Sequence, residues 1–262
     1  MPSDRRPRRL VLVAALVLAS TASAEPPLQP SYDLVPDLAV TGGACAATLS
    51  LLLLEEKLAP TRCRWCDPSG VEEDLSRRLR WSDPDAAAKG SSVLSFTLAG
   101  AALGYSLYEG YRRENPEDGW ANALLIVEAT SVAMLLDRTA KYAFARQRPD
   151  AWRGDTRGDP HDRNLSFFSA HSTFAFAIAA SSSTLLLEQR APHAKTYAVL
   201  AYGAAATTAY LRVAADRHYV SDVLVGAAVG TLVGWAIPHF FHGPTESGLH
   251  LAPAPGGIAL VW

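Results

Sequence analysis

Six apolar stretches separated by polar segments account for most of the chain. They cover residues 38–54, 90–108, 121–136, 171–187, 196–211 and 223–241. Each has 16 to 19 residues and is rich in Ala, Gly, Ser and Thr. This length is near the lower limit for crossing a bilayer, and small residues are typical of closely packed membrane helices. The pattern predicts an all-α fold, a six-helix bundle embedded in a membrane, although buried helices of a soluble bundle share it.

Both ends of the chain differ from the helical part. Residues 1–24 combine a basic start, a short apolar run and the small residues Ala22 and Ala24, a pattern typical of a secretory signal peptide. Residues 25–36 form a Pro-rich lead-in before the helical domain, 37–241, whose motif-bearing core is about 90–240. Residues 242–262 form a short tail with two extended pieces around a turn. We expect a protein of the bacterial cell envelope, in the inner membrane or alternatively in the periplasm.

The polar segment 55–89 lies between the first two apolar stretches. Val71, Leu75 and Leu79 recur at helical spacing and predict a short amphipathic helix lying flat at one end of the bundle. Cys63 and Cys66 are only three residues apart. In an exported protein this spacing favours a local disulfide, with free thiols, a redox pair or half of a metal site as alternatives.

Composition narrows the functional classes. With 262 residues, 49% of them hydrophobic, the chain is long enough for one helical domain and too apolar for extended disorder. A net charge of −2 argues against a nucleic-acid-binding protein, which needs a broad basic face. The mean hydropathy of +0.06 is low for a chain made only of lipid-embedded helices. The function must therefore depend on local clusters of charged residues and not on the net charge of the chain.

The first cluster follows the third apolar stretch. Lys141 and Arg148 are seven residues apart, and Pro149 follows them. On a helix that continues to Arg148, both cations would emerge on one face, and Pro149 would end the helix. Two such cations at the mouth of an apolar bundle can bind a dianion such as phosphate. Arg138 and Arg146 flank them and are expected to point to solvent. Alone, the motif also fits an ordinary basic helix end.

The second cluster, Ser169-Ala170-His171, directly precedes the fourth apolar stretch. A Ser at a helix start is an ordinary N-cap, but free backbone N–H groups and the positive end of the helix dipole can also bind an anion there.

The third cluster, Arg212, His218 and Asp222, lies where the fifth stretch meets the sixth. On a helix, Asp222 would lie one turn beyond His218 and could hold the imidazole in one tautomer, or the two could form a surface ion pair. Arg212 would share their face only if the chain bends near Ala215 or Asp216.

The three clusters fall at one end of the bundle, because successive helices alternate in direction. Their joint pattern resembles the type 2 phosphatidic acid phosphatase superfamily, which includes bacterial acid phosphatases and vanadium haloperoxidases. Its signature is Lys-x6-Arg-Pro, then Pro-Ser-Gly-His, then Ser-Arg-x5-His-x3-Asp. The resemblance covers about residues 90–240. The first motif is complete, whereas Phe168 and Ala170 replace the Pro and Gly of the second, and Leu211 replaces the Ser of the third.

The resemblance implies a metal-independent histidine phosphatase without a cofactor. In the family pattern, His218 attacks phosphorus to form a phosphohistidine, and Asp222 orients it. His171 protonates the departing alkoxide and then activates water. The phosphate-binding groups would be Lys141, Arg148, Ser169, the Ala170 amide and Arg212. The best chelating segment, Asp159 to Asp162, is expected to be a solvated loop.

The expected substrate is a phosphorylated lipid or an isoprenyl pyrophosphate, because apolar walls beside a cationic pocket suit a charged head with an apolar tail. The alternatives are a periplasmic acid phosphatase for soluble substrates, a vanadium haloperoxidase, and a non-catalytic membrane scaffold or transporter with vestigial motifs. Two orientations of the site relative to the membrane are compatible with the sequence. Lys and Arg are concentrated in loops 55–89 and 137–170, which favours a cytoplasmic site, whereas related membrane phosphatases usually face the periplasm.

Overall fold

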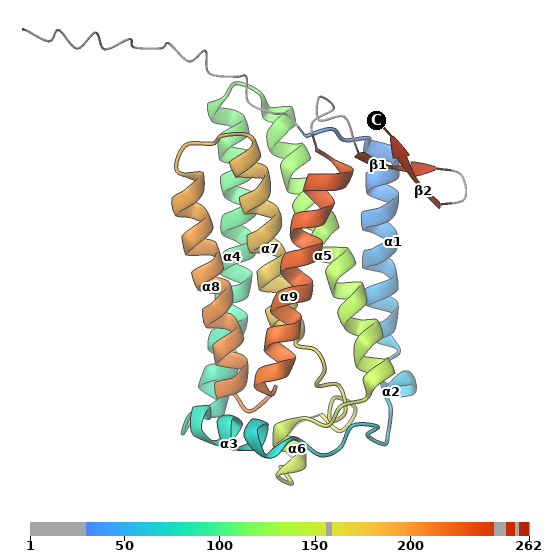
Figure 1. Cartoon of the computed structure of the whole chain (residues 1–262), viewed down its shortest axis with the longest axis vertical. Helices are drawn as coiled ribbons and strands as arrows, with labels where there is room; N and C mark the ends of the chain where they lie inside the picture. The colour runs from blue at the N-terminus through green and yellow to red at the C-terminus, as the bar shows by residue number, and fades with distance from the viewer. Residues whose placement is uncertain (1–29, 156–158, 244–249, 255–256, 262) are drawn as a thin grey trace, which may run out of the picture.

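The computed structural model describes residues 30–155, 159–243, 250–254 and 257–261, so the predicted signal peptide lies outside the described residues. Six long helices run side by side (Figure 1). They are α1 (Leu34–Leu53), α4 (Pro84–Arg112), α5 (Pro116–Phe144), α7 (Ala170–Glu188), α8 (Ala194–Ala214) and α9 (Val220–Ala236), which continues as the π-helix η1 (Ile237–Phe241). Short helices α2 (Glu55–Leu58), α3 (Gly70–Leu79) and α6 (Pro149–Trp152) lie at one end of the bundle.

The predicted all-helical class is confirmed, but the expected count of six is too low for the part of the chain described. That part contains nine α-helices, because the two long polar loops contribute three short ones. The predicted amphipathic helix is α3, which begins with a capping box between Ser69 and Glu72. Cys63 and Cys66, in the loop before α3, form the expected disulfide.

Local sequence explains where the long helices begin. The Asp33 carboxylate accepts a hydrogen bond from the Val35 amide at the start of α1. The Asp83 carboxylate likewise accepts one from the Ala86 amide over 3.0 Å, and Pro84 occupies the first helical position of α4, where no N–H is needed. These caps satisfy amides that would otherwise lack a partner at the helix ends.

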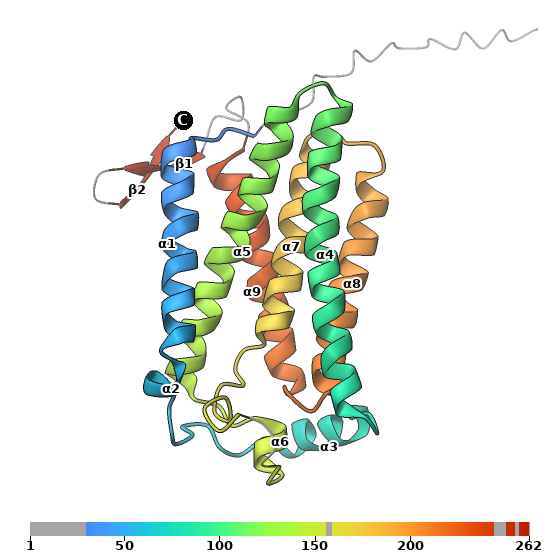
Figure 2. The ribbon, with the colours of Figure 1, turned by 180° about the vertical axis from the view of Figure 1, so that it is seen from behind.

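Helix α7 occupies the centre of the bundle and packs against α4, α5, α8 and α9 (Figure 2). Its buried face is made of small residues such as Ala175, Ala179 and Ser182. On α9, glycines face it: a Cβ on Gly226 would lie 2.8 Å from the Ser169 carbonyl oxygen. The absence of a side chain at Gly226 therefore lets the first turns of α7 and α9, which both carry motif residues, approach closely.

Among the described residues, four helical segments are long and apolar enough to cross a membrane: Leu34–Leu53, Pro116–Phe144, Ala170–Glu188 and Val220–Phe241. Large apolar side chains also face outward from the bundle, among them Leu53, Val199, Leu200, Leu224 and Leu232. An apolar outer surface of this kind is what a helix bundle presents to lipid.

The tail lies at the end of the bundle opposite to α3 and α6 (Figure 1). Strands β1 (His250–Ala254) and β2 (Gly257–Val261) pair antiparallel, with Ala252 opposite Ala259. The two extended pieces expected in the tail are thus present as a hairpin.

Candidate active site

The predicted site residues lie together at the end of the bundle that carries α3 and α6. Lys141 and Arg212 lie in the last turns of α5 and α8. Ser169, Ala170 and His171 lie at the start of α7, and Asp222 lies in the first turn of α9. Arg148 and His218 lie in the connecting loops. The expected bend after Arg212 is present, because α8 ends at Ala214 and Asp216 has a positive φ of 59°.

Arg148 reaches this region by a route that the sequence analysis did not predict. Helix α5 does not continue to Pro149; it ends at Phe144, and Ala145 adopts the left-handed conformation with φ of 46°. The next residues run alongside the disulfide loop, where the Gln147 amide donates to the Trp65 carbonyl oxygen over 3.0 Å. Arg148 therefore approaches from a loop and caps α6, instead of sharing a helix face with Lys141.

His218 is 1% exposed, and both of its ring nitrogens have partners. Nδ1 lies 2.8 Å from the main-chain carbonyl oxygen of Ser166, and Nε2 lies 3.2 Å from Nη1 of Arg148. A carbonyl can only accept and a guanidinium can only donate, so these partners require the proton on Nδ1 and a lone pair on Nε2. The geometry therefore defines one tautomer, with Nε2 as the unprotonated nitrogen.

The surroundings also keep this imidazole neutral. Burial lowers the pKa of His218 well below its ordinary value of 6.5, and the positive charges of Arg148, Lys141 and Arg212 lower this pKa further. A neutral imidazole has a free lone pair at Nε2, which is the form that a nucleophile requires.

The Asp222 carboxylate accepts hydrogen bonds from several groups around His218. Its Oδ2 lies 3.7 Å from Nδ1 of His218, farther than the Ser166 carbonyl oxygen that accepts the Nδ1–H. Closer contacts join Oδ2 to the Ser166 hydroxyl (2.6 Å) and to the Tyr219 amide (2.9 Å), while Oδ1 accepts from Arg146 (2.6 Å). Asp222 thus holds the residues on both sides of the imidazole.

Arg146 does not point to solvent as expected; it is 1% exposed. Its guanidinium binds Asp222 and Glu72 of α3 and lies 3.7 Å from the centre of the Trp65 ring. Burial would raise the pKa of Glu72, but hydrogen bonds from Arg146 and Ser221 outweigh it and hold this pKa below the usual value. Arg138 is not free either, since it pairs with Glu55 over 3.0 Å. The spacing of residues could not predict the ion pairs of Arg146 and Arg138, because their partners lie far away in the sequence.

Lys141 is 2% exposed and points at the loop before α7. Its ammonium group donates to the carbonyl oxygens of Leu165 (3.1 Å) and Phe168. Asp137, one turn earlier on α5, lies 3.5 Å away, and neither of its oxygens has a hydrogen-bond partner among the described residues. Lys141 therefore has a nearby counter-charge and also ties the loop that carries Ser166 to α5.

The segment Asp159 to Asp162 is more than a solvated loop. Nη2 of Arg148 donates to the Asp162 carboxylate over 2.6 Å, and Nε donates to the Asp162 carbonyl oxygen over 2.9 Å. Burial would raise the pKa of Asp162, but Arg148 and Lys141 outweigh it and keep this carboxylate ionised. Asp162 therefore holds Arg148 in place and sets a negative charge beside the candidate phosphate site.

Two serines of α4 that belong to none of the three motifs contact the predicted site residues. Nε2 of His171 lies 3.1 Å from the Ser92 hydroxyl, and Nη1 of Arg212 donates to the Ser91 hydroxyl over 3.1 Å. Nε of Arg212 is buried without a hydrogen-bond partner in the described structure. Helix α4 thus supports both groups, and Arg212 retains donor capacity for an anion.

Ser169 is the N-cap of α7, as expected, and accepts a hydrogen bond from the Ser172 amide. Ala170 is the first helical residue, so its backbone conformation does not need the glycine of the family motif. Its amide lies in the first turn, where helix N–H groups have no partner within the helix and can bind an anion.

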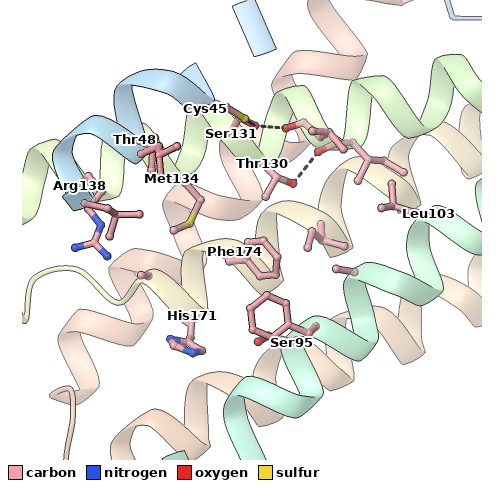
Figure 3. A pocket seen from close by; sticks show the side chains of 18 residues that line it. Cys45, Thr48, Ser95, Leu103, Thr130, Ser131, Met134, Arg138, His171 and Phe174 are labelled. Carbon is pink, nitrogen blue, oxygen red and sulfur yellow. Dashed lines mark hydrogen bonds between the residues drawn. The ribbon is translucent and has the colours of Figure 1, made fainter. Parts of the chain in front are cut away.

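Two cavities of contrasting character adjoin this end of the bundle. An apolar cavity of about 600 Å³ lies between α1, α4, α5 and α7 and reaches Ala170 and His171 (Figure 3). A polar cavity of about 430 Å³ is lined by Lys89, Ser92, Asp162, Arg212 and Arg217, with Ala88 and Val93. The hydrogen bond between Ser92 and His171 joins their linings. His171, which lines the apolar cavity, therefore contacts Ser92, which lines the polar one.

Comparison with known proteins agrees with this arrangement. Residues 121–246 match the family model described as the PAP2 superfamily. A lipid A 1-phosphatase of Porphyromonas gingivalis is 32% identical over 142 residues, which cover 52% of this chain and 28% of that protein. The chain therefore spans less than a third of the length of this relative.

The fold also has a solved counterpart. The crystal structure of a transmembrane PAP2-type phosphatidylglycerolphosphate phosphatase from Bacillus subtilis superposes with a TM-score of 0.50 and 18% identity. The superposition covers 74% of this chain and 93% of that one, and it indicates the same helical fold. The segment that carries the motif residues, 121–246, is therefore similar to the PAP2 superfamily. Together with the four apolar helices, these likenesses indicate a membrane protein.

Proposed function

We propose that this protein hydrolyses phosphate monoesters or pyrophosphates of membrane lipids, through a phosphohistidine formed on His218. We further propose that it does so in the inner membrane of a bacterial cell. The match of residues 121–246 to the PAP2 superfamily model, the likeness to a lipid A 1-phosphatase over 142 residues and the chemistry of the site support this assignment.

The observation that supports a lipid substrate is the hydrogen bond between His171, which lines the apolar cavity, and Ser92, which lines the polar one. The polar cavity, with Lys89, Arg212 and Arg217, suits a phosphorylated head group. The apolar cavity, with walls such as Leu49, Phe96 and Phe174, suits an acyl or isoprenyl tail. A lipid phosphate would therefore span both cavities with its ester oxygen beside His171.

In the first step, the lone pair on Nε2 of His218 attacks phosphorus in line with the leaving group. The Nε2–P bond forms as the bond between phosphorus and the ester oxygen breaks, and His171 gives a proton to that oxygen. In the second step, His171 removes a proton from water, the resulting hydroxide attacks phosphorus, and the N–P bond breaks. Inorganic phosphate leaves, and both histidines return to their starting forms.

The remaining site residues would stabilise the charge on the transferring phosphoryl group. Arg148 already lies within 3.2 Å of the attacking nitrogen, and Arg212 has an unused donor. Lys141, the Ser169 hydroxyl and the Ala170 amide complete the cationic and dipolar surroundings. Asp222 acts as a positioning residue, because it binds the Ser166 hydroxyl and the Tyr219 amide on either side of His218.

The direct test is phosphate release by detergent-purified protein from phosphatidate, an isoprenyl pyrophosphate and a soluble aryl phosphate. The variants are His218→Ala, His171→Ala and the matched control His239→Ala. His239 lies in η1, and its exposed imidazole pairs with Glu188 at the end of α7. Release from a lipid that is lost in the first two variants and kept in the control supports the proposal. Release from the aryl ester alone would favour a soluble-substrate acid phosphatase, and no release from any substrate would favour a scaffold.

A further inference from the structure

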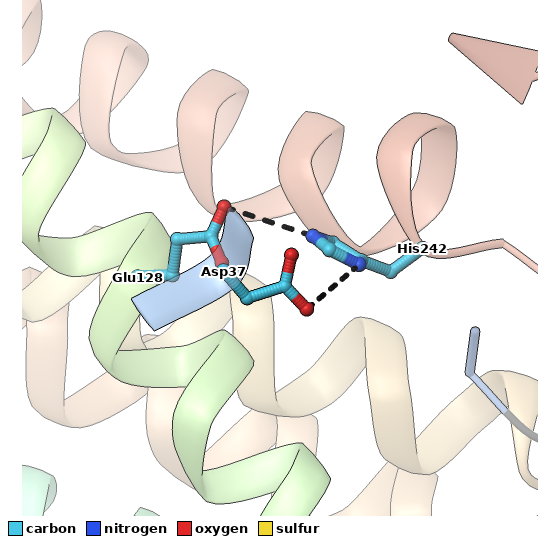
Figure 4. Close-up of side chains that lie close together, drawn as sticks. All are labelled: Asp37, Glu128 and His242. Carbon is cyan, nitrogen blue, oxygen red and sulfur yellow. Dashed lines mark ion pairs between the residues drawn. The ribbon is translucent and has the colours of Figure 1, made fainter. Parts of the chain in front are cut away.

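A second cluster of buried ionisable groups lies at the opposite end of the bundle from His218. Asp37 in the first turn of α1, Glu128 in the middle of α5 and His242 just after η1 face one another (Figure 4). Their exposed fractions are only 6%, 5% and 6%. Glu128 precedes Lys141 by 13 residues on α5, which corresponds to roughly 20 Å along the helix axis. The proposed phosphatase chemistry does not use this cluster.

The charges of the cluster do not balance. Two carboxylates face a single imidazole, with Glu128 Oε1 3.6 Å from Nε2 and Asp37 Oδ2 4.0 Å from Nδ1 of His242. Within the described residues, no Lys or Arg forms an ion pair with either carboxylate. Even with a protonated imidazole, one buried negative charge would have no counter-charge, which is costly in a protein interior.

The imidazole is oriented as a metal ligand would be. Nδ1 of His242 lies 2.9 Å from the main-chain carbonyl oxygen of Ser31, so Nδ1 carries the proton and Nε2 presents a lone pair toward Glu128. Similarly, Oδ2 of Asp37 accepts a hydrogen bond from the Asp33 amide over 2.9 Å. Such outer contacts from backbone groups fix the tautomer and orientation of ligating side chains.

Two further polar groups lack partners at this place. Oε2 of Glu128 is buried without a hydrogen bond in the described structure, and Figure 4 shows the Glu128 carboxylate facing Asp37 and His242. The hydroxyl of Thr41 is likewise buried and unpartnered, and its residue is 8% exposed. Thr41 lies one turn beyond Asp37 on α1, on the same helix face. The cluster therefore has unused oxygen donors in addition to its charge imbalance.

We propose that Asp37, Glu128 and His242 bind a divalent transition-metal ion of the Zn²⁺ class. An imidazole nitrogen and carboxylate oxygens are ligand types that Zn²⁺ accepts, and two carboxylates would balance its charge. The candidate ligand atoms lie within 4.8 Å of one another. Tetrahedral zinc ligands at about 2.0–2.2 Å from the ion lie about 3.4 Å apart, so the ligand atoms must approach one another by up to about 1.4 Å when the ion binds.

The ion would join three separate segments. Helix α1 packs mainly against α5, and its residues Cys45, Leu49 and Leu52 form one wall of the apolar cavity. A metal shared by α1, α5 and the end of η1 would fix this wall in position. The site is structural, and it goes beyond the proposed phosphatase activity, which requires no metal.

The test is metal binding by the detergent-purified full chain after treatment with a chelator. Bound metal is measured after Zn²⁺ has been added and free metal removed by dialysis, and the unfolding temperature is measured in excess Zn²⁺. Both are measured for wild type, Glu128→Gln and the control His239→Ala. Wild type and the control are expected to retain one Zn²⁺ per chain. At a hundredfold excess over Kd, their unfolding temperature should rise by about 5 to 10 °C. Glu128→Gln keeps the side-chain shape and should lose both effects.

Wild type that retains no Zn²⁺, or Glu128→Gln that retains it as wild type does, would overturn the proposal. Stoichiometric binding of Mg²⁺ in preference to Zn²⁺ would overturn the assignment of the metal class. His242→Ala provides a second variant, expected to lose Zn²⁺ in the same way. Because the readouts are bound metal and unfolding temperature, they do not depend on the phosphatase assay, so either proposal can fail without the other.

Discussion

Nδ1 of His218 donates its proton to the main-chain carbonyl oxygen of Ser166 over 2.8 Å. The Ser166 hydroxyl in turn donates to Asp222 over 2.6 Å. The carboxylate that the family motif places one helical turn from the histidine therefore acts on it mainly through the loop before α7. A backbone carbonyl cannot be removed by substitution, so the tautomer of His218 is built into the path of the main chain.

Removal of the Ser166 hydroxyl should test this link. In Ser166→Ala the carbonyl remains, but the loop loses its hydrogen bond to the buried Asp222 carboxylate, a bond worth about 1.5–3 kcal/mol. We expect kcat to fall by roughly tenfold, because His218 is less well positioned, and KM to change by less than about twofold. Steady-state kinetics on a lipid phosphate checks both values. An unchanged kcat would mean that the loop is held without Asp222.

The pH dependence of kcat/KM should reflect the lowered pKa of His218. The neutral imidazole is the reactive form, and it is lost when pH falls through that pKa. Burial, Arg148, Lys141 and Arg212 keep the pKa well below 6.5, so the acid limb due to His218 should lie well below pH 6.5. In Arg148→Gln one of these positive charges is gone, and the limb should move to higher pH. A limb that stays in place in Arg148→Gln would contradict this electrostatic account.

The buried pair Arg146 and Asp222 should matter for stability. Arg146→Ala leaves the Asp222 carboxylate, which is fully buried, without its guanidinium partner. Loss of one partner of a buried pair costs about 3–5 kcal/mol, so the unfolding temperature should fall by several degrees. Arg77→Ala is the matched control, because Arg77 pairs with Glu73 on the exposed surface of α3. Equal effects of the two substitutions on thermal unfolding would argue against the buried pair.

Asp162 places a negative charge beside a site proposed to bind phosphate. Asp162→Asn removes this charge from Arg148 while it preserves the main-chain carbonyl that accepts from Nε. Anion binding should therefore tighten, with inhibition constants for inorganic phosphate and vanadate lowered by about three- to tenfold, since close charges interact by a kcal/mol or more. Weaker inhibition in the variant would show that the main effect of Asp162 is to position Arg148.

Much of the bundle follows from short-range features of the sequence. Each apolar stretch predicts a helix, and the alternating direction of successive helices predicts that Lys141, Ser169 and Arg212 approach one end. The bend at Asp216 also follows, because Arg212 and His218 could not otherwise share a side. These inferences depend on spacing within one or two helices, which periodicity reports directly.

Other contacts depend on chain segments that are distant in sequence, and spacing alone could not predict them. Arg146 looked like one more cation of a basic loop, but its partner Glu72 is 74 residues away. Helix α5 ends early because the chain after Phe144 pairs with the disulfide loop, which a helical spacing from Lys141 to Arg148 does not reveal. Ser92 and Ser166 belong to no motif, and their importance follows only from their contacts with the two histidines.

The most direct test of the central claim is to identify the residue that carries the phosphoryl group. His171→Ala lacks the proposed base for the second step, so the phosphoenzyme should accumulate when this variant meets an isoprenyl pyrophosphate, whose phosphate leaving group needs no proton from His171. Alkaline quenching, which preserves a phosphoramidate bond, followed by peptide mass spectrometry should then find phosphate on His218. The double variant His171→Ala/His218→Ala should carry none. Phosphate on another residue, or lipid hydrolysis that persists in His218→Ala, would contradict the account.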